Sequence, residues 1–352
     1  MREIFATFGA PEMVAVLVAV VFNAYVLMGG ADLGSGVWDL FATGQRRAAQ
    51  RDLIAAAIGP IWEANHVWLI IVVVMLFTAF PPAFAVITTV LHIPLSLLLV
   101  GIVLRGSAFV FRSYGGQNAP ARVRWGRTFA IASVATPILL GTVVGAIATG
   151  ATSDAFAHIG SAGFSEVFVA PWLAPFPIAI GLLALMLFAQ LAATYLTLVA
   201  DVGSLQDDFR RRAIGASVAT ILVAIFAMAI RPTPADAAPS SLLSGMAGWL
   251  WFAVTAAAAA AGIGALWRRR FAAARVAVCA EVSLIVWGWA AAQYPFLVPP
   301  TITIRASAAP ASTLDELLIA LGIGAVLLVP SLAYLLKTFA AHGTAKHESH
   351  TE

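Results

Sequence analysis

Gly59-Pro60-Ile61-Trp62-Glu63-Ala64-Asn65-His66-Val67-Trp68 opens an apolar run that continues from Leu69 to Phe80. This stretch places a carboxylate, an amide, an imidazole and two indoles beside a segment long enough to cross a bilayer. An ionisable side chain costs about 2.5–3.5 kcal/mol at the centre of a transmembrane helix. The polar residues are therefore candidates for function, and the apolar run indicates a membrane protein.

The composition of the whole chain supports the same class. The 352 residues are 61% hydrophobic and 11% charged, whereas soluble domains carry about 25% charged residues. The single cysteine, Cys279, excludes an internal disulfide and any multi-cysteine metal or iron–sulfur site. The net charge of +3 does not predict nucleic-acid binding, because the arginines fall in short clusters between apolar runs. We also expect no cleavable signal, since the first apolar run is long enough to span and stay.

The apolar runs predict an all-α polytopic membrane protein with nine transmembrane helices, since each span needs about 20 apolar residues. Because proline is tolerated only in the first turn of a helix, we expect the second span to start near Pro60, with residues 50–59 outside it. The predicted spans are 13–36, 53–80, 84–105, 127–150, 176–200, 213–231, 245–266, 275–295 and 315–338.

The basic residues predict the orientation, with the N-terminus outside and the C-terminus in the cytoplasm. Lysine and arginine accumulate in cytoplasmic loops, and this orientation puts 17 of the 20 basic residues on that side. Only Arg2, Arg231 and Arg305 then lie outside. Arg105 is assigned to the cytoplasmic loop after the third span.

A short internal repeat suggests two similar halves. Ala31-Asp32-Leu33-Gly34-Ser35 ends the first predicted span, and Ala200-Asp201-Val202-Gly203-Ser204 ends the fifth. Because both spans run inward, the repeat would be parallel and would give two four-helix bundles with one helix left over. The predicted units are a first bundle at 1–150, a second bundle at 151–296, an external loop with the ninth helix at 297–338, and a disordered cytoplasmic tail at 339–352.

Four carboxylates fall near the cytoplasmic ends of predicted spans: Asp32, Glu63, Asp201 and Glu281. Protonatable groups at that depth are what a proton entrance needs. The alternative is that Asp32 and Asp201 are helix-end residues that face headgroups or pair with nearby arginines.

Glu63 is the strongest of these candidates for proton transfer. Asn65 and His66 lie in the same helical turn and could form a hydrogen-bonded relay with it. A haem or metal site is less well supported, because His66 and His92 show no repeated ligand spacing and Glu63-x-x-His66 has no second copy. We expect this chain to ligate neither a haem nor a metal ion.

Other polar and small residues have structural interpretations. Asn23, Gln190 and Gln293 are expected to form interhelical hydrogen bonds. Gly29, Gly30, Gly34 and Gly36 do not follow a strand and form no dinucleotide fingerprint, so they indicate close helix packing.

Three ordered motifs resemble subunit II of the cytochrome bd-type quinol oxidases, including the cyanide-insensitive branch. They are Gly30 to Gly36, Pro60 to Trp68, and Trp287 to Pro295 running into Val298-Pro299-Pro300. The resemblance covers essentially the whole chain. It implies nine helices in two four-helix bundles plus one, and a location in the bacterial cytoplasmic (inner) membrane.

The resemblance also implies a role in a complex that oxidises quinol and reduces dioxygen to water. Subunit I, the partner, carries haems b and d, or b only, whereas subunit II ligates no haem. Subunit II is expected to support assembly, to contribute a cytoplasmic proton route, and to contact lipid or a bound quinone. Small accessory subunits are left open. The proton-route candidates are Glu63, Asp32, His66 and Glu281, and the motif residues with structural roles are Trp62, Asn65, Trp68, Gln293 and Tyr294.

The motif departs from the family pattern at two positions. Family members often have Asp where this chain has Glu63 and Gln where it has His66. Glutamate keeps the titratable group, and the histidine adds a second one.

Two other interpretations remain open from the residues alone. One is an ion-coupled secondary transporter with parallel helical repeats and Glu63 as the coupling carboxylate, although transporter sites lie near the midplane. The other is a haem-ligating cytochrome subunit that uses His66 and His92.

Overall fold

The computed structural model describes residues 9–114, 119–200, 203–232 and 245–348. The side chains of residues 58–64 lie outside this description, as do those of several residues near 113–122 and beyond 328. Most of the described chain is helical. The exception is a small antiparallel pair of strands, β1 (Phe296–Val298) and β2 (Ile302–Thr303).

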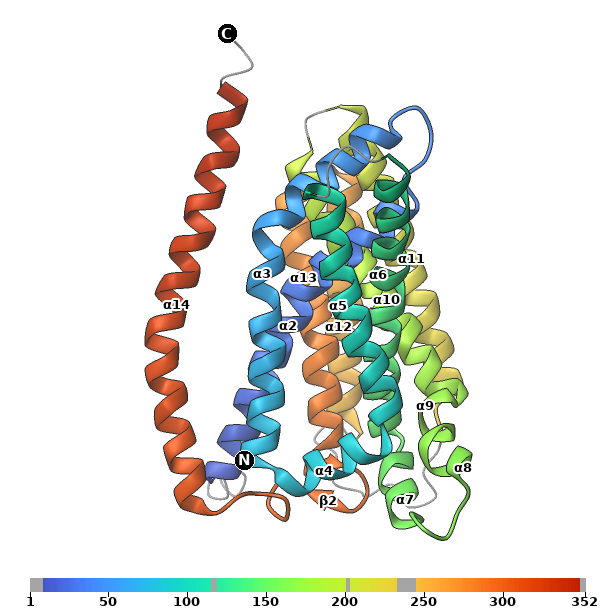
Figure 1. The fold of residues 1–352 in the computed structure, drawn as a ribbon, viewed down its shortest axis with the longest axis vertical. Coiled ribbons are helices and arrows are strands. Elements are labelled where there is room, and N and C mark those ends of the chain that lie inside the picture. Colours follow the sequence, from blue (N-terminus) through green and yellow to red (C-terminus); the bar gives the residue numbers. More distant parts are fainter. Residues whose placement is uncertain (1–8, 115–118, 201–202, 233–244, 349–352) are drawn as a thin grey trace.

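Long helices that run back and forth between two ends dominate the fold (Figure 1). Eight helices within the described residues are long and apolar enough to cross a membrane, and a ninth is added if the bent α3–α4 pair is one span. This agrees with the predicted all-α polytopic membrane fold. The long helices are α2 (Ala10–Leu40), α3 (Arg47–Ala79), α5 (His92–Tyr114), α6 (Ala119–Ala148), α10 (Pro175–Val199), α11 (Ser204–Ala229), α12 (Met246–Trp267), α13 (Phe271–Gln293) and α14 (Ala311–Glu348).

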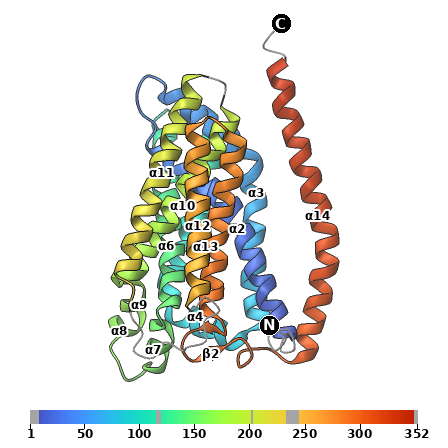
Figure 2. The same ribbon diagram turned by 180° about the vertical axis from the view of Figure 1, so that it is seen from behind.

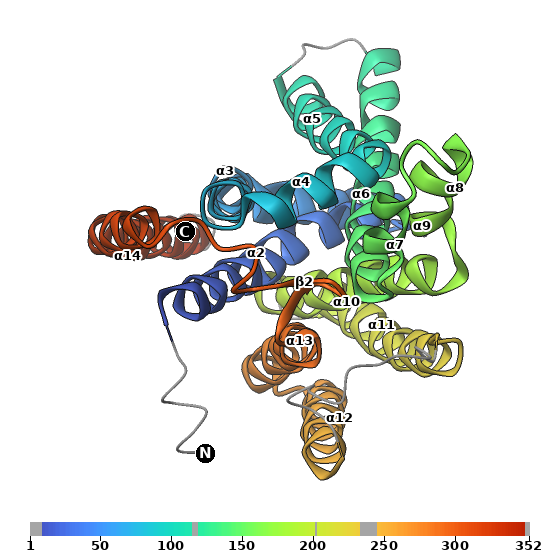
Figure 3. The same ribbon diagram turned by 90° about the horizontal axis from the view of Figure 1, so that it is seen from below.

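The two ends of the bundle differ in their chemistry. One end holds the α2–α3, α10–α11 and α12–α13 connections, and we call it the arginine-rich end after Arg46, Arg51, Arg210, Arg212 and Arg269. The other, which we call the short-helix end, carries β1 and β2 and four short helices (Figures 1 and 3). These are α4 (Pro81–Val90), α7 (Ala151–Ala157), α8 (Phe164–Phe168) and α9 (Ala170–Leu173).

The third predicted span, 84–105, is wrong in its position. α3 ends at Ala79 because Phe80 has non-helical dihedrals and Pro81-Pro82 follows it. A residue before proline disfavours the helical region, and proline offers no N–H. α4 therefore turns by 118° across the end of α3. The membrane-crossing helix starts only at His92, so Arg105 lies inside α5 instead of in a loop.

Helix α3 also differs from the expected start of the second span. It runs without interruption from Arg47 through position 60 to Ala79, so residues 50–59 belong to the same helix as the apolar run. The fifth to ninth predicted spans overlap α10 to α14. α14 extends to Glu348, beyond position 338 and into the range 339–352.

Helix α10 lies at the centre of the packing and contacts α2, α6, α11 and α13. Glycines allow these close approaches. A Cβ atom at Gly34 of α2 would overlap the carbonyl oxygen of Phe188 in α10, and one at Gly30 would lie 2.9 Å from side-chain atoms of Phe188 and Leu191. The prediction that the glycine motif serves helix packing is confirmed.

Helix α14 lies on the flank of the bundle. Its first turns, including Leu314 and Leu318, join a hydrophobic cluster with Val14 of α2 and Met75 of α3. Beyond these turns the helix runs apart from the others, as Figures 1 and 2 show. The core is therefore formed by the remaining long helices.

Candidate functional site

Asp32 lies inside a helix rather than at its end. The prediction that residues 31–35 end the first span is wrong, because α2 continues to Leu40 and adds two turns beyond Asp32. The residue is 2% exposed. An ionised carboxylate at such a position needs a partner that offsets its lost hydration.

That partner is Arg105 of α5, which is 1% exposed. Its Nη2 atom lies 2.6 Å from Oδ1 of Asp32 and its Nη1 atom 2.9 Å from Oδ2. Nη2 also donates to the backbone carbonyl of Asp32 at 2.9 Å. This is the bidentate geometry of a strong arginine–carboxylate pair. Of the alternative interpretation, the pairing of Asp32 with an arginine is confirmed, but its position at a helix end is not.

Asn65 and His66 of α3 complete the group. Nδ2 of Asn65 donates to Oδ2 of Asp32 at 2.6 Å, and Oδ1 of Asn65 is hydrogen-bonded to Nδ1 of His66. Asn65 is 1% exposed, while His66 is half-buried. A continuous polar chain therefore joins α5, α2 and α3. We call Asp32, Arg105, Asn65 and His66 the buried polar cluster.

Helix α6 supports the arginine of this cluster. Nε of Arg105 donates to Oγ of Ser133 at 3.0 Å, and Oγ of Ser133 donates to the carbonyl oxygen of Phe129 at 2.7 Å. The guanidinium carbon also lies 4.9 Å from the centre of the Phe129 ring. Gly36 of α2 gives Ser133 its room, because a Cβ atom there would overlap the serine side chain.

A second ion pair group lies two turns closer to the arginine-rich end. Asp39 of α2 is 1% exposed, and its Oδ2 atom accepts a hydrogen bond of 3.0 Å from Nη1 of Arg112. Nε of Arg51 lies 3.6 Å from its Oδ1 atom. Seven residues of helix, or about 10 Å, separate Asp39 from Asp32. Asp39 is thus a second buried carboxylate of α2 that is paired with arginine, and Glu12, which pairs with Arg305 at the other end of the helix, is a third.

The predicted motif residues Glu63 and Trp62 belong to α3, but their side chains lie outside the described residues. The same holds for Asp201 as a whole residue. Trp68, one turn beyond Asn65, donates from Nε1 to Sδ of Met28 at 3.1 Å and so ties α3 to α2.

Glu281 lies in a separate contact. It is 2% exposed, and Oε2 accepts a hydrogen bond of 2.8 Å from Nε2 of Gln190, which joins α13 to α10. The predicted interhelical hydrogen bond of Gln190 is therefore confirmed. No described hydrogen bond links this pair to the buried polar cluster, so the structure does not bring Glu281 together with Asp32.

The third motif lies at the short-helix end. Gln293 ends α13, and its Nε2 atom is buried without a hydrogen-bond partner among the described residues. Tyr294 packs against the hydrophobic cluster that contains Val14 and Met75. At this end Arg305 also pairs with Glu12, and this hydrogen bond raises the pKa of Arg305. These residues are far from the buried polar cluster along the helices.

The histidines are not placed to share a haem. α3 continues for 13 residues, or about 20 Å, from His66 to its end at Ala79. His92 begins α5 beyond that end, and its Nδ1 atom lies 2.9 Å from the carbonyl oxygen of Thr89. Two axial ligands must face one iron from opposite sides, so this pair does not fit a haem.

Sequence reasoning missed Arg105 and Asp39. Arg105 was assigned to a loop because the third span was predicted to begin at position 84, directly after Pro81-Pro82, so that most of α4 was counted as part of it. A third span that starts at His92 puts Arg105 about 13 Å from the far end of α5 at Tyr114, and would have marked it as a partner for Asp32. Asp39 offered only its position seven residues after Asp32 as a signal.

Comparisons with known proteins identify the family of the chain. Residues 10–339 match the family model described as cytochrome bd terminal oxidase subunit II. The chain is 29% identical over 214 residues to cytochrome bd ubiquinol oxidase subunit 2 of Bacillus subtilis, and this alignment covers 61% of the chain and 60% of that protein. It is 23% identical over 327 residues to a putative cytochrome bd menaquinol oxidase subunit II of the same organism, covering 90% and 91%.

The alignment with cytochrome bd-I ubiquinol oxidase subunit 2 of Escherichia coli is 26% identical and covers 60% of the chain and 54% of that protein. The fold is similar to a solved structure of bd oxidase from Geobacillus thermodenitrificans, with a TM-score of 0.73 and 20% identity. That match covers 94% of this chain and 98% of the other.

Proposed function

The chain belongs to the cytochrome bd terminal oxidase subunit II family, and on that premise we propose that it is the haem-free membrane subunit of a terminal quinol oxidase. The complex would couple oxidation of quinol to reduction of dioxygen to water. The names of the relatives, which are subunits of ubiquinol and menaquinol oxidases, support this activity. Family membership sets aside the secondary-transporter interpretation.

The proposed partner is a haem-bearing subunit I in the bacterial cytoplasmic membrane. We propose that haems b and d, or b only, reside in that partner, because His66 and His92 of this chain do not fit one haem between them. The arginine-rich end would face the cytoplasm, in line with the usual bias of basic residues. Contacts with lipid or a bound quinone belong to the same proposal.

The proposed contribution of this chain to chemistry is a route for protons from the cytoplasm. Reduction of one dioxygen to two waters consumes four protons, and protons cannot cross hydrocarbon without polar groups. The observation that carries this proposal is the hydrogen-bonded chain from Asp32 through Asn65 to His66. It places a half-buried imidazole next to a fixed ion pair, three residues from Glu63.

Within this route the residues would have different roles. The Asp32 carboxylate accepts three hydrogen bonds from Arg105 and Asn65, so protonating it would break a strong pair. We infer that Asp32 and Arg105 are positioning residues that hold Asn65 and thereby orient His66. Glu63 and His66 would then transfer the protons. Glu281 could take part only in a second path that is separate from the buried polar cluster.

Substitution of Glu63 tests the route. We expect Glu63→Gln to slow steady oxygen consumption by the purified complex about tenfold, which corresponds to about 1.4 kcal/mol on the barrier, with the haem absorption spectrum unchanged. His66→Leu, which removes the hydrogen bond to Asn65 as well as the titratable group, should slow turnover in the same way. Glu166→Gln is the matched control, because Glu166 is an exposed carboxylate at the short-helix end. Full turnover in Glu63→Gln, or loss of haem from the complex, would overturn the proton role of Glu63.

A further inference from the structure

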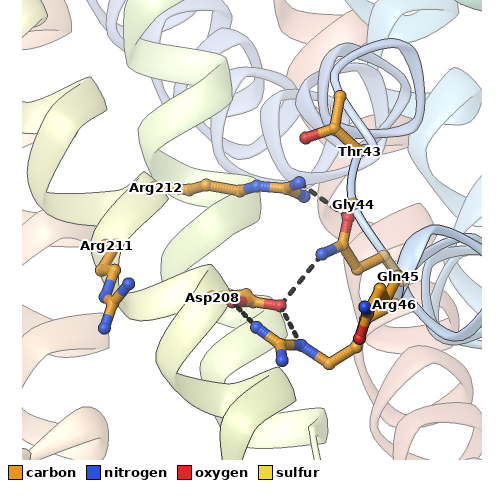
Figure 4. Close-up of a pocket in the computed structure, with 8 residues that line it drawn as sticks. Thr43, Gly44, Gln45, Arg46, Asp208, Arg211 and Arg212 are labelled. Atoms are coloured by element: carbon orange, nitrogen blue, oxygen red, sulfur yellow. Dashed lines mark hydrogen bonds and ion pairs between the residues drawn. The ribbon is translucent and has the colours of Figure 1, made fainter.

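An open pocket lies at the arginine-rich end between the α2–α3 connection and the first turns of α11 (Figure 4). Its volume is about 470 Å³. Residues of the connection and the first turn of α3 line one side, including Arg46 and Gln50, and Asp208, Arg211 and Arg212 line the other. Three arginines thus face one carboxylate, which leaves two positive charges in excess.

The carboxylate is already paired within the pocket wall. Nε and Nη2 of Arg46 donate to the two oxygens of Asp208, both at 2.7 Å, and Nε2 of Gln50 donates to Oδ2 at 3.0 Å. The hydrogen bond to Asp208 raises the pKa of Arg46. Asp208 and Arg46 therefore balance each other, and the excess charge belongs to Arg211 and Arg212.

Arg212 is held in place by neutral partners. Its Nη2 atom donates to Oε1 of Gln50 at 2.7 Å and to the carbonyl oxygen of Phe41 at 3.1 Å. Its guanidinium carbon lies 5.5 Å from the centre of the Trp38 ring and 5.3 Å from that of Phe209. The Nη1 atom is buried and has no hydrogen-bond partner among the described residues. The Arg212 side chain is therefore held in a fixed position at the pocket wall.

Arg211 provides a second cation on the same side of the pocket. It is exposed and makes no hydrogen bond or ion pair within the described part of the chain, and Figure 4 draws it without a contact. Arg211 and Arg212 are consecutive in α11 and both line the pocket, and Figure 4 shows their side chains extending from the helix in different directions. Planar guanidinium forks match the oxygens of phosphate groups.

We propose that this pocket binds a phosphate group, carried by the headgroup of an anionic phospholipid or by a soluble phosphate compound. Basic pockets between transmembrane helices at the cytoplasmic surface suit such headgroups. The pocket lies at the end of the helices, where headgroups lie in a bilayer, and its excess of two positive charges suits an anion. A bound phosphate would also connect the α2–α3 connection to α11.

The test uses the purified oxidase complex in a zwitterionic detergent and follows its thermal unfolding temperature. One arm adds phosphatidylglycerol in mixed micelles, and the other adds inorganic phosphate at constant ionic strength. A ligand that binds only the folded state raises the unfolding temperature. We expect at least one probe to do so, and we expect Arg211→Gln to raise the half-saturating concentration about tenfold, the effect of losing one charged hydrogen bond.

Arg268→Gln is the matched control, because Arg268 is an exposed arginine in the α12–α13 turn at the same end but outside the pocket. It should respond to each probe as the unsubstituted complex does. A response to phosphatidylglycerol alone identifies the lipid headgroup as the source, whereas a response to inorganic phosphate identifies a soluble compound. The proposal is overturned if neither probe stabilises the complex or if Arg211→Gln behaves like Arg268→Gln.

Discussion

The Asp32–Arg105 pair joins α2 to α5 through three hydrogen bonds from the Arg105 guanidinium to Asp32. Both side chains are essentially inaccessible to solvent, at 0% and 1% exposed. Removing two charges from water costs several kcal/mol each, and their attraction repays this only when geometry and further hydrogen bonds are good. Here Asn65 and Ser133 supply those further bonds. The pair is therefore sensitive to the loss of either partner.

Asp32→Asn tests this sensitivity at the residue scale. The change keeps the shape of the side chain but leaves the Arg105 guanidinium buried without its counter-charge. We expect a loss of about 3–5 kcal/mol of unfolding free energy, measured as a lower unfolding temperature and a lower yield of the assembled complex.

The double variant Asp32→Asn with Arg105→Met is the control for this explanation. Replacing a buried pair by uncharged groups of similar volume is often close to neutral, so the second substitution should restore much of the lost stability. If the Asp32→Asn complex is as stable as the unsubstituted one, the packing of α2, α3 and α5 does not depend on this ion pair.

At the scale of the element, α2 owes its position to glycine. Gly30 and Gly34 face Phe188 and Leu191 of α10, and Gly36 faces Ser133 of α6. The three glycines lie on both sides of Asp32 along the helix. Close approach of α2 to its neighbours and the placement of the buried polar cluster therefore depend on the same short segment.

Gly34→Ala should weaken the α2–α10 contact. The new methyl group would overlap a backbone carbonyl, which cannot move aside as a flexible side chain can. We expect a loss of about 2–3 kcal/mol of unfolding free energy, in the range of overpacking, together with lower haem content of the purified complex. Thermal unfolding and the haem spectrum measure the two effects.

Gly215→Ala is the matched control, because Gly215 lies within α11 and nothing stands within 4 Å of a Cβ atom there. Removing a helical glycine in open surroundings gains about 0.5–1 kcal/mol. A drop in stability of the same size in both variants would show that the loss in Gly34→Ala does not come from the α2–α10 contact.

The elements also show how far sequence reasoning reached. Hydropathy was sufficient for the class of fold and for the approximate positions of α10 to α14, because each of these helices carries its own apolar run. It failed near Phe80, where two apolar helices follow one another and only Pro81-Pro82 marks the bend. That error moved Arg105 into a loop and concealed the partner of Asp32. The buried polar cluster joins residues of α2, α3 and α5 that are far apart in the sequence. A local sequence pattern does not predict such contacts.

For the whole molecule, the predicted division into bundles at 1–150 and 151–296 stays a prediction. α10 packs along α2 and α6 as well as along α11 and α13, so the two halves would meet along this helix. Gly141 of α6 would, with a Cβ atom, come within 2.6 Å of the backbone of Gly181 in α10. Two halves joined this closely would unfold together and not as separate domains.

The orientation of the whole molecule gives the last prediction. Basic residues favour the arginine-rich end in the cytoplasm, which is also the side from which the proposed route would take its protons.

Ala48 is exposed at the arginine-rich end and Ala157 is exposed at the short-helix end. In a Cys279→Ala background, which removes the only cysteine, Ala157→Cys should react with a membrane-impermeant maleimide on cells whose cytoplasmic membrane is intact, while Ala48→Cys should react only after that membrane is opened. The reverse labelling pattern would mean that the arginine-rich end faces the outside and that the buried polar cluster lies nearer the outer surface. A proton route from the cytoplasm through Glu63 and His66 would then have no entrance at the arginine-rich end.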